Sequence, residues 1–184
     1  DKISLSPQIR VSIIFVSSII FISISNIYIN NYNFIFIDKL VELNFFTYLF
    51  TTFCILFLLN SYNYFDGIDG IASILFIIFI FNISFVKFFY NYPYLDYYLI
   101  LLPFIIFLFF NFSSKYKMFL GNNGSASIGF VMSLILIYLS NHFYLIFPPS
   151  LVIWIVAIFV YEFLSINLSR FIKKISILQT GKDH

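Results

Sequence analysis

The chain has 184 residues, of which 61% are hydrophobic, 23% aromatic and only 10% charged, and its mean hydropathy is +0.99. An ordinary soluble domain carries roughly 25% charged residues, so this composition excludes that class and indicates an integral membrane protein. The net charge of +2, without a basic face bearing base-stacking aromatics, argues against nucleic acid as a partner. One cysteine, Cys54, excludes an internal disulfide and is typical of a small buried hydrophobic residue.

Six apolar stretches, taken in chain order, are predicted to cross the membrane. A bilayer core about 30 Å thick needs ~20 mainly apolar residues per helix. The predicted spans cover residues 11–29, 43–60, 70–86, 97–111, 126–141 and 149–168. We therefore predict an all-α, polytopic helical bundle in which residues 1–184 form a single transmembrane domain, and not a soluble core bundle. The alternation of Phe and Ile within segment 30–42 is typical of a small hairpin.

The basic residues predict the orientation of the bundle, because short cytoplasmic loops retain Lys and Arg. If the six helices alternate in direction, eight basic residues share one side: Lys2, Arg10, Lys115, Lys117, Arg170, Lys173, Lys174 and Lys182. Only Lys39 and Lys87 lie on the other side. Segments 1–10, 61–69, 112–125 and 169–184 are therefore predicted to face the cytoplasm, and 30–42, 87–96 and 142–148 the outside.

The segment Asn60-Ser-Tyr-Asn-Tyr-Phe-Asp-Gly-Ile-Asp-Gly is a polar sequence between two long apolar runs. Its carboxylates, Asp66 and Asp69, and the amide oxygens of Asn60 and Asn63 are hard donors that suit magnesium. The glycines permit a tight backbone and the close approach of a ligand. The alternative is a helix cap followed by a turn, since Asp is a common cap and Gly a common helix stop.

A second glycine-rich segment, Lys117-Met-Phe-Leu-Gly-Asn-Asn-Gly-Ser125, opens the fifth predicted helix. Free backbone donors at a helix start form a ready anion site, so this segment is a candidate phosphate-binding loop. A simple turn between two membrane helices is the alternative.

The end of the chain carries a third cluster, composed of Arg170, Lys173, Lys174, Lys182 and His184. This cluster is either part of a binding site or only a cytoplasmic flank. Glu162 lies eight residues before Arg170 in the last predicted span. Ionisable groups inside membranes are costly and usually functional, so Glu162 is kept as a supporting residue.

Four segments together resemble the polyprenyl-phosphate N-acetylhexosamine-1-phosphate transferases, membrane enzymes of glycosyltransferase family 4 that start bacterial lipid-linked glycan synthesis. Asn60 to Gly70 is similar to the family motif Asn-Ala-x-Asn-x-x-Asp-Gly-x-Asp-Gly. Asp1 to Arg10, Asp-x-x-x-Leu-Ser-Pro-x-x-Arg, resembles the stretch that begins with the second of two adjacent aspartates. Lys117 to Ser125 resembles Lys-x-Phe-x-Gly-Asp-x-Gly-Ser, and Arg170 to His184 the start of a basic cytoplasmic loop with a His-rich motif.

The resemblance implies that the phosphate of undecaprenyl phosphate attacks the β-phosphorus of a UDP-N-acetylhexosamine, with Mg²⁺ as cofactor, and releases UMP. It places the chain in the bacterial cytoplasmic membrane, with the active-site loops cytoplasmic. Asp1 would handle the lipid phosphate and metal; Asp66, Asp69 and Asn63 would contact metal or nucleotide. Phe119 would stack on uracil. The basic side of the nucleotide-sugar site would comprise Lys117, Arg170, Lys173, Lys174 and His184.

The chain departs from the family pattern in three ways. Asn122 stands in place of the usual metal-binding Asp. The substitution keeps an oxygen donor at this position but removes a negative charge. The first Asp of the adjacent pair and the rest of the His-rich motif are missing, so the chain is predicted to be a C-terminal fragment that is inactive as it stands. Glu162 stands where the family has an Asp near the start of the final cytoplasmic segment.

The Leu5-Ser6-Pro7 and Arg10 pattern resembles the branch that uses simple UDP-N-acetylhexosamines for lipopolysaccharide O-antigen, teichoic acid or other cell-wall glycans. UDP-GlcNAc or a close relative is the predicted sugar donor. The alternatives are a degenerate transferase inactivated by Asn122, or a polytopic transporter or lipid-binding protein. A transporter normally places charged sites near the bilayer midplane, where only Glu162 qualifies.

Overall fold

The computed structural model describes residues 6–30, 44–67, 69–89 and 98–174, and in these ranges every regular element is a helix. In chain order the helices are α1 (Pro7–Ser25), α3 (Asn44–Phe65), α4 (Ile71–Phe89), α5 (Tyr98–Asn111), α6 (Gly121–His142), α7 (Pro149–Ile155) and α8 (Ala157–Ile172). The all-α, polytopic membrane fold is confirmed. Residues 31–42 of the segment predicted as a hairpin lie outside the described residues, as do Asp1, Lys2, Lys39, Lys182 and His184.

The six predicted apolar segments all contain helix, but their lengths differ from the prediction of six full spans. Within the described residues, α1, α3 and α6 are long and apolar enough to cross a bilayer, and α7 with α8 makes a fourth if counted as one span. The described part of α5 has 14 residues. At ~1.5 Å per residue that is about 21 Å, which is shorter than the hydrocarbon core. The structure thus confirms the positions of the helices but not the number of spans.

Several helix ends differ from the prediction, and two of them have a clear local explanation. α1 begins at Pro7, where the Ser6 hydroxyl accepts the Ile9 N–H, and it stops at Ser25 because Asn26 is in the left-handed region with φ of 54°. The predicted end at residue 29 is therefore wrong. α3 continues to Phe65 instead of ending at residue 60. Its polar side chains are accommodated because Asn60 and Ser61 donate to carbonyls one turn earlier, those of Leu56 and Phe57.

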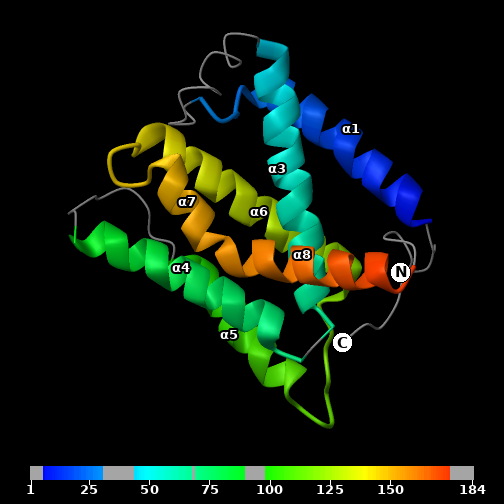
Figure 1. Cartoon of the computed structure of the whole chain (residues 1–184). Coiled ribbons are helices and arrows are strands. Elements are labelled where there is room, and N and C mark those ends of the chain that lie inside the picture. Colours follow the sequence, from blue (N-terminus) through cyan, green and yellow to red (C-terminus); the bar gives the residue numbers. More distant parts are fainter. Residues whose placement is uncertain (1–5, 31–43, 68, 90–97, 175–184) are drawn as a thin grey trace.

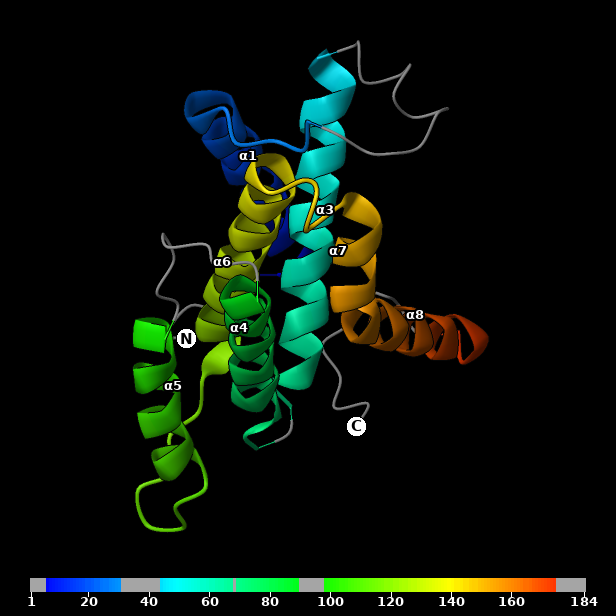
Figure 2. The same cartoon turned by 90° about the vertical axis from the view of Figure 1, so that its left-hand side faces the viewer.

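The last predicted span is two helices and not one. α7 and α8 meet at Val156 with a bend of 61°. Neither a proline nor a glycine stands there, and Val156 itself leaves helical geometry with φ of −93° and ψ of 5°. Figure 2 shows the consequence, since α8 turns away from the direction of α3 and extends outward from the bundle.

The α3–α6 pair is the centre of the fold, with α1, α4 and α8 arranged around it (Figure 1). α3 and α6 approach closely at Gly129, where an added Cβ would lie 2.9 Å from the Leu59 Cα. Small residues at such contacts are the usual means of helix association in membranes. A core of aromatic and aliphatic side chains, including Tyr62, Phe76, Met132 and Phe159, packs around this pair.

The outer faces of the helices carry large exposed hydrophobic side chains, among them Phe45, Phe88, Leu99, Phe109 and Trp154. An apolar exterior of this extent is unfavourable in water, whereas lipid tails solvate it well. The exposed surface therefore agrees with the composition in indicating a membrane-integral protein.

Candidate active site

The turn between α3 and α4, which carries both aspartates, is held from two sides. The buried Tyr62 hydroxyl, on the last turns of α3, donates to the Ala72 carbonyl at the start of α4. Gly70 has φ of +77°, and the Phe112 ring occupies the space where a Cβ would lie. Only glycine fits both conditions, so the chain closes tightly after Asp69 and presents the aspartates at the end of the helix.

Asp66 faces the first residue of α6. Its carboxylate accepts a hydrogen bond from the Gly121 backbone N–H, at a helix start that favours negative charge. Burial nevertheless raises the pKa of Asp66, and the Gly121 hydrogen bond offsets only part of that effect. The raised pKa reflects the cost of keeping this carboxylate charged in a partly buried position, a cost that a neighbouring cation would reduce.

Asp69 pairs with Lys117, whose Nζ lies 2.5 Å from the Asp69 Oδ2. The two side chains are 47% and 39% exposed respectively, so the pair lies at the surface of the site. The Lys117 Nζ also lies 5.2 Å from the centre of the Phe119 ring, and that ring is itself exposed. Two loops 48 residues apart in sequence are thereby joined.

The asparagines meet in a polar cavity between α1, α3 and α6. The buried Ser125 hydroxyl donates to the Asn63 Oδ1 at 2.7 Å. Next to this bond is a cavity of about 370 Å³. Its lining contains Asn60, Asn63, Asn122, Asn123, Ser127 and Arg10, with Ile13, Ile14, Leu59 and Ala126 as apolar walls.

The basic cluster at the end of α8 is only partly connected to this site. The Arg170 guanidinium is buried and lies 5.7 Å from the centre of the Tyr64 ring, near the end of α3. Lys173 and Lys174 follow α8 and are exposed. Glu162 is half-buried on α8 and is not among the residues that line the polar cavity.

The structure thus brings together the ends of several elements that lie far apart in sequence. The predicted site residues that converge are Asn60, Asn63, Asp66, Asp69, Lys117, Phe119 and Asn122. Asp1 and His184 lie outside the described residues. Arg10 and Ser125 are cavity and support residues that the sequence reasoning did not place in the site, although both stand in its motifs. Arg10 was counted toward membrane orientation and the family motif, but not as a site residue.

The comparison with family models gives the identity of this arrangement. Residues 1–140 match the model described as glycosyl transferase family 4. The chain belongs to glycosyl transferase family 4. A comparison with curated proteins and one with solved structures gave no match.

For this family 4 protein, membership confirms the resemblance seen in the motifs and implies polyprenyl-phosphate sugar-1-phosphate transferase activity in a membrane. The matched region contains α1, α3, α4, α5 and nearly all of α6, and therefore both loops of the candidate site.

The oxygen donors of the family 4 site are of the chemical types that bind a hard divalent cation. Within the described ranges no group of three or more His, Cys, Asp and Glu side chains occurs. The available donor atoms are instead a mixture of carboxylate and amide oxygens. Asp66 is hydrogen-bonded to Gly121, the next residue is Asn122, and Asn122 lines the same cavity as Asn63. Oxygen donors of these two kinds are those that magnesium accepts.

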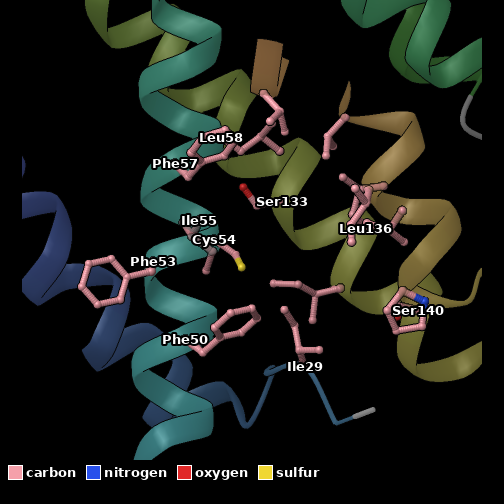
Figure 3. A pocket seen from close by; sticks show the side chains of 16 residues that line it. Ile29, Phe50, Phe53, Cys54, Ile55, Phe57, Leu58, Ser133, Leu136 and Ser140 are labelled. Carbon is pink, nitrogen blue, oxygen red and sulfur yellow. The ribbon is translucent and has the colours of Figure 1, made fainter. Parts of the chain in front are cut away.

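A second cavity lies on another face of α3 and differs completely in lining. It measures about 400 Å³ and is bounded by α3, α6, α7 and α8. Figure 3 shows Phe50 and Cys54 of α3 facing Leu136 and Ser140 of α6 across it. None of the described residues that line it is Asp, Glu, Lys, Arg or His. The cavity is suited to hydrocarbon.

Proposed function

We propose that this family 4 protein transfers N-acetylhexosamine-1-phosphate from a UDP-sugar to undecaprenyl phosphate and releases UMP. UDP-GlcNAc or a close relative is the proposed donor, and the product would start a lipid-linked cell-surface glycan. The supporting observation is the convergence of the two glycine-rich loops, joined by the Asp69–Lys117 pair and the Asp66–Gly121 hydrogen bond. Oxygen donors and cations are thereby held at one end of an apolar bundle.

In the proposed reaction an oxygen of the lipid phosphate attacks the β-phosphorus of the UDP-sugar. A new phosphorus–oxygen bond forms while the bond from the β-phosphorus to the bridging oxygen breaks, and that oxygen leaves with the electron pair as part of UMP. Such a transfer requires little covalent chemistry from the protein. Positioning the two phosphates and neutralising their charge are the tasks of the site.

We assign the metal site to Asp66, Asn63 and Asn122, with Asp69 beside them. Bound magnesium would neutralise negative charge on the diphosphate. The Ser125 hydroxyl uses one acceptor position of the Asn63 oxygen, which has a second lone pair for another partner. Lys117 holds Asp69 in place and adds a positive charge near the diphosphate.

The nucleotide is assigned to the surface beside this metal site. The exposed Phe119 ring offers a face for uracil, and Asn60 lines the neighbouring cavity. Arg170, Lys173, Lys174 and His184 are proposed to form the basic side, and Asp1 to act on the lipid phosphate. We place this surface on the cytoplasmic side of the bacterial inner membrane, where a soluble nucleotide and a lipid phosphate can meet.

A carrier of charged solutes is the weaker alternative. Such a protein normally binds its solute near the bilayer midplane with charged or broken-helix groups. The cavity beside the middle of α3 has an apolar lining instead, whereas the polar groups gather at a helix end. This distribution favours chemistry at the interface over passage through the bundle.

The test is a UMP-release assay with the full-length protein in detergent or native membrane. UDP-GlcNAc, undecaprenyl phosphate and magnesium are supplied together, and matched reactions omit the lipid, omit the metal or replace the donor by another UDP-sugar. We expect UMP release that requires both lipid and magnesium. Release no greater than in the lipid-free reaction, with every UDP-sugar tried, would refute the proposed function.

A further inference from the structure

A tyrosine on α3 connects the aspartate turn to the bent helix α8. The Tyr62 side chain is completely buried, and its hydroxyl donates to the Ala72 carbonyl at the start of α4. Its ring stacks on the ring of Phe159 in α8, with the ring centres 5.8 Å apart and the ring planes 24° from parallel. One side chain therefore joins the helix that ends at the aspartates to the two helices beside it.

Phe159 packs against the end of α3 through a second ring as well. The buried Phe159 ring meets the Phe65 ring edge-on, with a centre distance of 5.3 Å and an angle of 81°. Phe65 is the last residue of α3 and directly precedes Asp66. Phe159 itself stands three residues after Val156, where α7 and α8 meet. The start of α8 is thereby packed against the helix end that carries the aspartates.

The Tyr62 hydroxyl bonds differently from other buried hydroxyls of the same helix. Thr52 and Ser61 each donate to a carbonyl one turn earlier in α3. A buried tyrosine hydroxyl also needs a partner, but that of Tyr62 lies across the turn, on Ala72. The Thr52 and Ser61 bonds constrain only α3, whereas the Tyr62 bond constrains both ends of the turn.

We propose that Tyr62 and Phe159 are positioning residues that fix the aspartate turn for its ligands. Neither lines the polar cavity, so they act through the backbone that carries Asp66 and Asp69. The Tyr62 hydroxyl fixes the start of α4, and the Phe159 ring fixes the end of α3. The inference rests on the proposed function for what the aspartates bind. A displacement of ~1 Å in a reacting group can cost about 100-fold in rate, so such a constraint has a chemical effect.

The first test measures local opening of the turn by amide hydrogen exchange and mass spectrometry, on the full-length protein in detergent. Tyr62→Phe keeps the ring and removes the hydroxyl. Thr52→Val is the matched control, because it removes another completely buried hydroxyl of α3 whose bond stays within that helix. The reporter is the start of α4, where the Ile74 N–H donates to the Gly70 carbonyl at 2.9 Å.

We expect Tyr62→Phe to speed exchange at the start of α4 about fivefold, the factor that corresponds to losing one net hydrogen bond. Thr52→Val should exchange there as wild type does. Wild-type exchange at the start of α4 in Tyr62→Phe, or an equal increase in both variants, would overturn the inference.

The second test asks whether the constraint serves the site or only stability. Phe159→Leu is added, with Phe163→Leu as its control, because Phe163 of α8 also contacts two α3 rings, those of Phe57 and Tyr64. Rates of UMP release are measured at a temperature where every variant is folded. We expect Tyr62→Phe and Phe159→Leu to lower kcat about tenfold and to raise the magnesium concentration for half-maximal rate, since a displaced turn misplaces its carboxylates.

The KM for the UDP-sugar should change little in these variants, because Phe119, the proposed uracil contact, lies on the other loop. Thr52→Val and Phe163→Leu should keep wild-type constants. A lower melting temperature with a wild-type kcat and magnesium requirement would assign Tyr62 and Phe159 to folding alone and would refute their positioning role.

Magnesium binding provides a measurement that does not need the transferase reaction. Thermal stability is followed as magnesium is added, and Tyr62→Phe should need more magnesium than Thr52→Val for the same stabilisation. A wild type that releases no UMP would reject the proposed function, while this difference in magnesium binding would still support the positioning role. UMP release at equal rates, with equal magnesium binding, in wild type and Tyr62→Phe would do the reverse.

Discussion

Two cavities of similar size lie on different faces of α3, one of about 370 Å³ and the other of about 400 Å³. The first is lined by four asparagines, a serine and an arginine, and the second almost entirely by hydrocarbon. The polar one lies at the end of α3 where two loops supply partners for its groups, while the apolar one lies farther along the helix. The difference shows that position along the helix determines which ligand each space suits.

The cost of burying polar groups explains why the two spaces differ. A polar side chain in hydrocarbon needs a protein partner, because lipid offers none. At the polar end, Asn63 finds Ser125, and Asp66 finds the Gly121 N–H. Ser133, which lines the apolar cavity, donates its hydroxyl within its own helix, to the Gly129 carbonyl. Charged ligands are therefore expected at the first cavity alone.

The largest expected effect tests whether the polar end carries the chemistry. Asp66→Asn keeps the size of the side chain and removes its charge, so UMP release should fall about 100-fold or more, the scale of losing one electrostatic contact in a transition state. Initial rates at saturating substrates are the measurement. Lys115→Gln is the control, and thermal stability checks folding. A wild-type rate for Asp66→Asn would show that its assigned role is wrong.

The apolar character of the second cavity can be tested through Cys54, the single cysteine of the chain. An uncharged maleimide should label Cys54 at least about 50-fold faster, relative to a free thiol, than a charged thiol reagent, because charge entering a membrane interior costs about 2.5 kcal/mol or more. Mass spectrometry measures the extent of labelling over time. Cys54→Ser gives the background. Equal relative rates would mean that water reaches this cavity and would remove the contrast with the polar one.

A smaller effect is expected from restoring the negative charge at position 122, where this chain departs from the family pattern. Asn122→Asp adds a carboxylate beside Asp66 and should lower the magnesium concentration for half-maximal UMP release about tenfold, by Coulomb attraction of the cation. The neighbouring Asn123→Asp is the control, since it adds the same charge one residue away in the same cavity. An unchanged magnesium requirement in Asn122→Asp, or an equal change in both variants, would exclude Asn122 as the metal ligand.

The smallest effect concerns the exposed ion pair at the rim of the polar end. A double-mutant cycle of Asp69→Asn and Lys117→Gln should give a coupling free energy of unfolding below about 1 kcal/mol, because both side chains are well exposed. If Lys117 serves the nucleotide, its single variant should raise the KM for the UDP-sugar with little loss of stability. A large coupling energy with an unchanged KM would instead assign the pair to folding.

The structure corrects the helix bounds that the sequence predicted, whereas the roles of the site residues stay predictions. Asn63 was placed in a loop and Asn60 at the last position of a span, yet both lie inside α3, because bonds such as that from Asn60 to the Leu56 carbonyl let the helix continue. The bend at Val156 has no proline or glycine to announce it. Which side chains line a shared cavity is likewise a tertiary property. For that reason Arg10 was read from the sequence as part of a family motif and as a marker of orientation, but not as a site residue.

The sequence by itself determined the membrane-integral, all-α class and the family, since composition and the motifs up to residue 140 carry that information. The sequence also indicated which polar residues could take part in binding or catalysis, because so few ionisable groups are present. Only the tertiary structure decided that α1, α3 and α6 enclose those groups at one end and leave an apolar cavity on another face of α3. The physical reason is that helix packing, set by contacts such as Gly129 on Leu59, is a relation between distant segments that no local pattern contains.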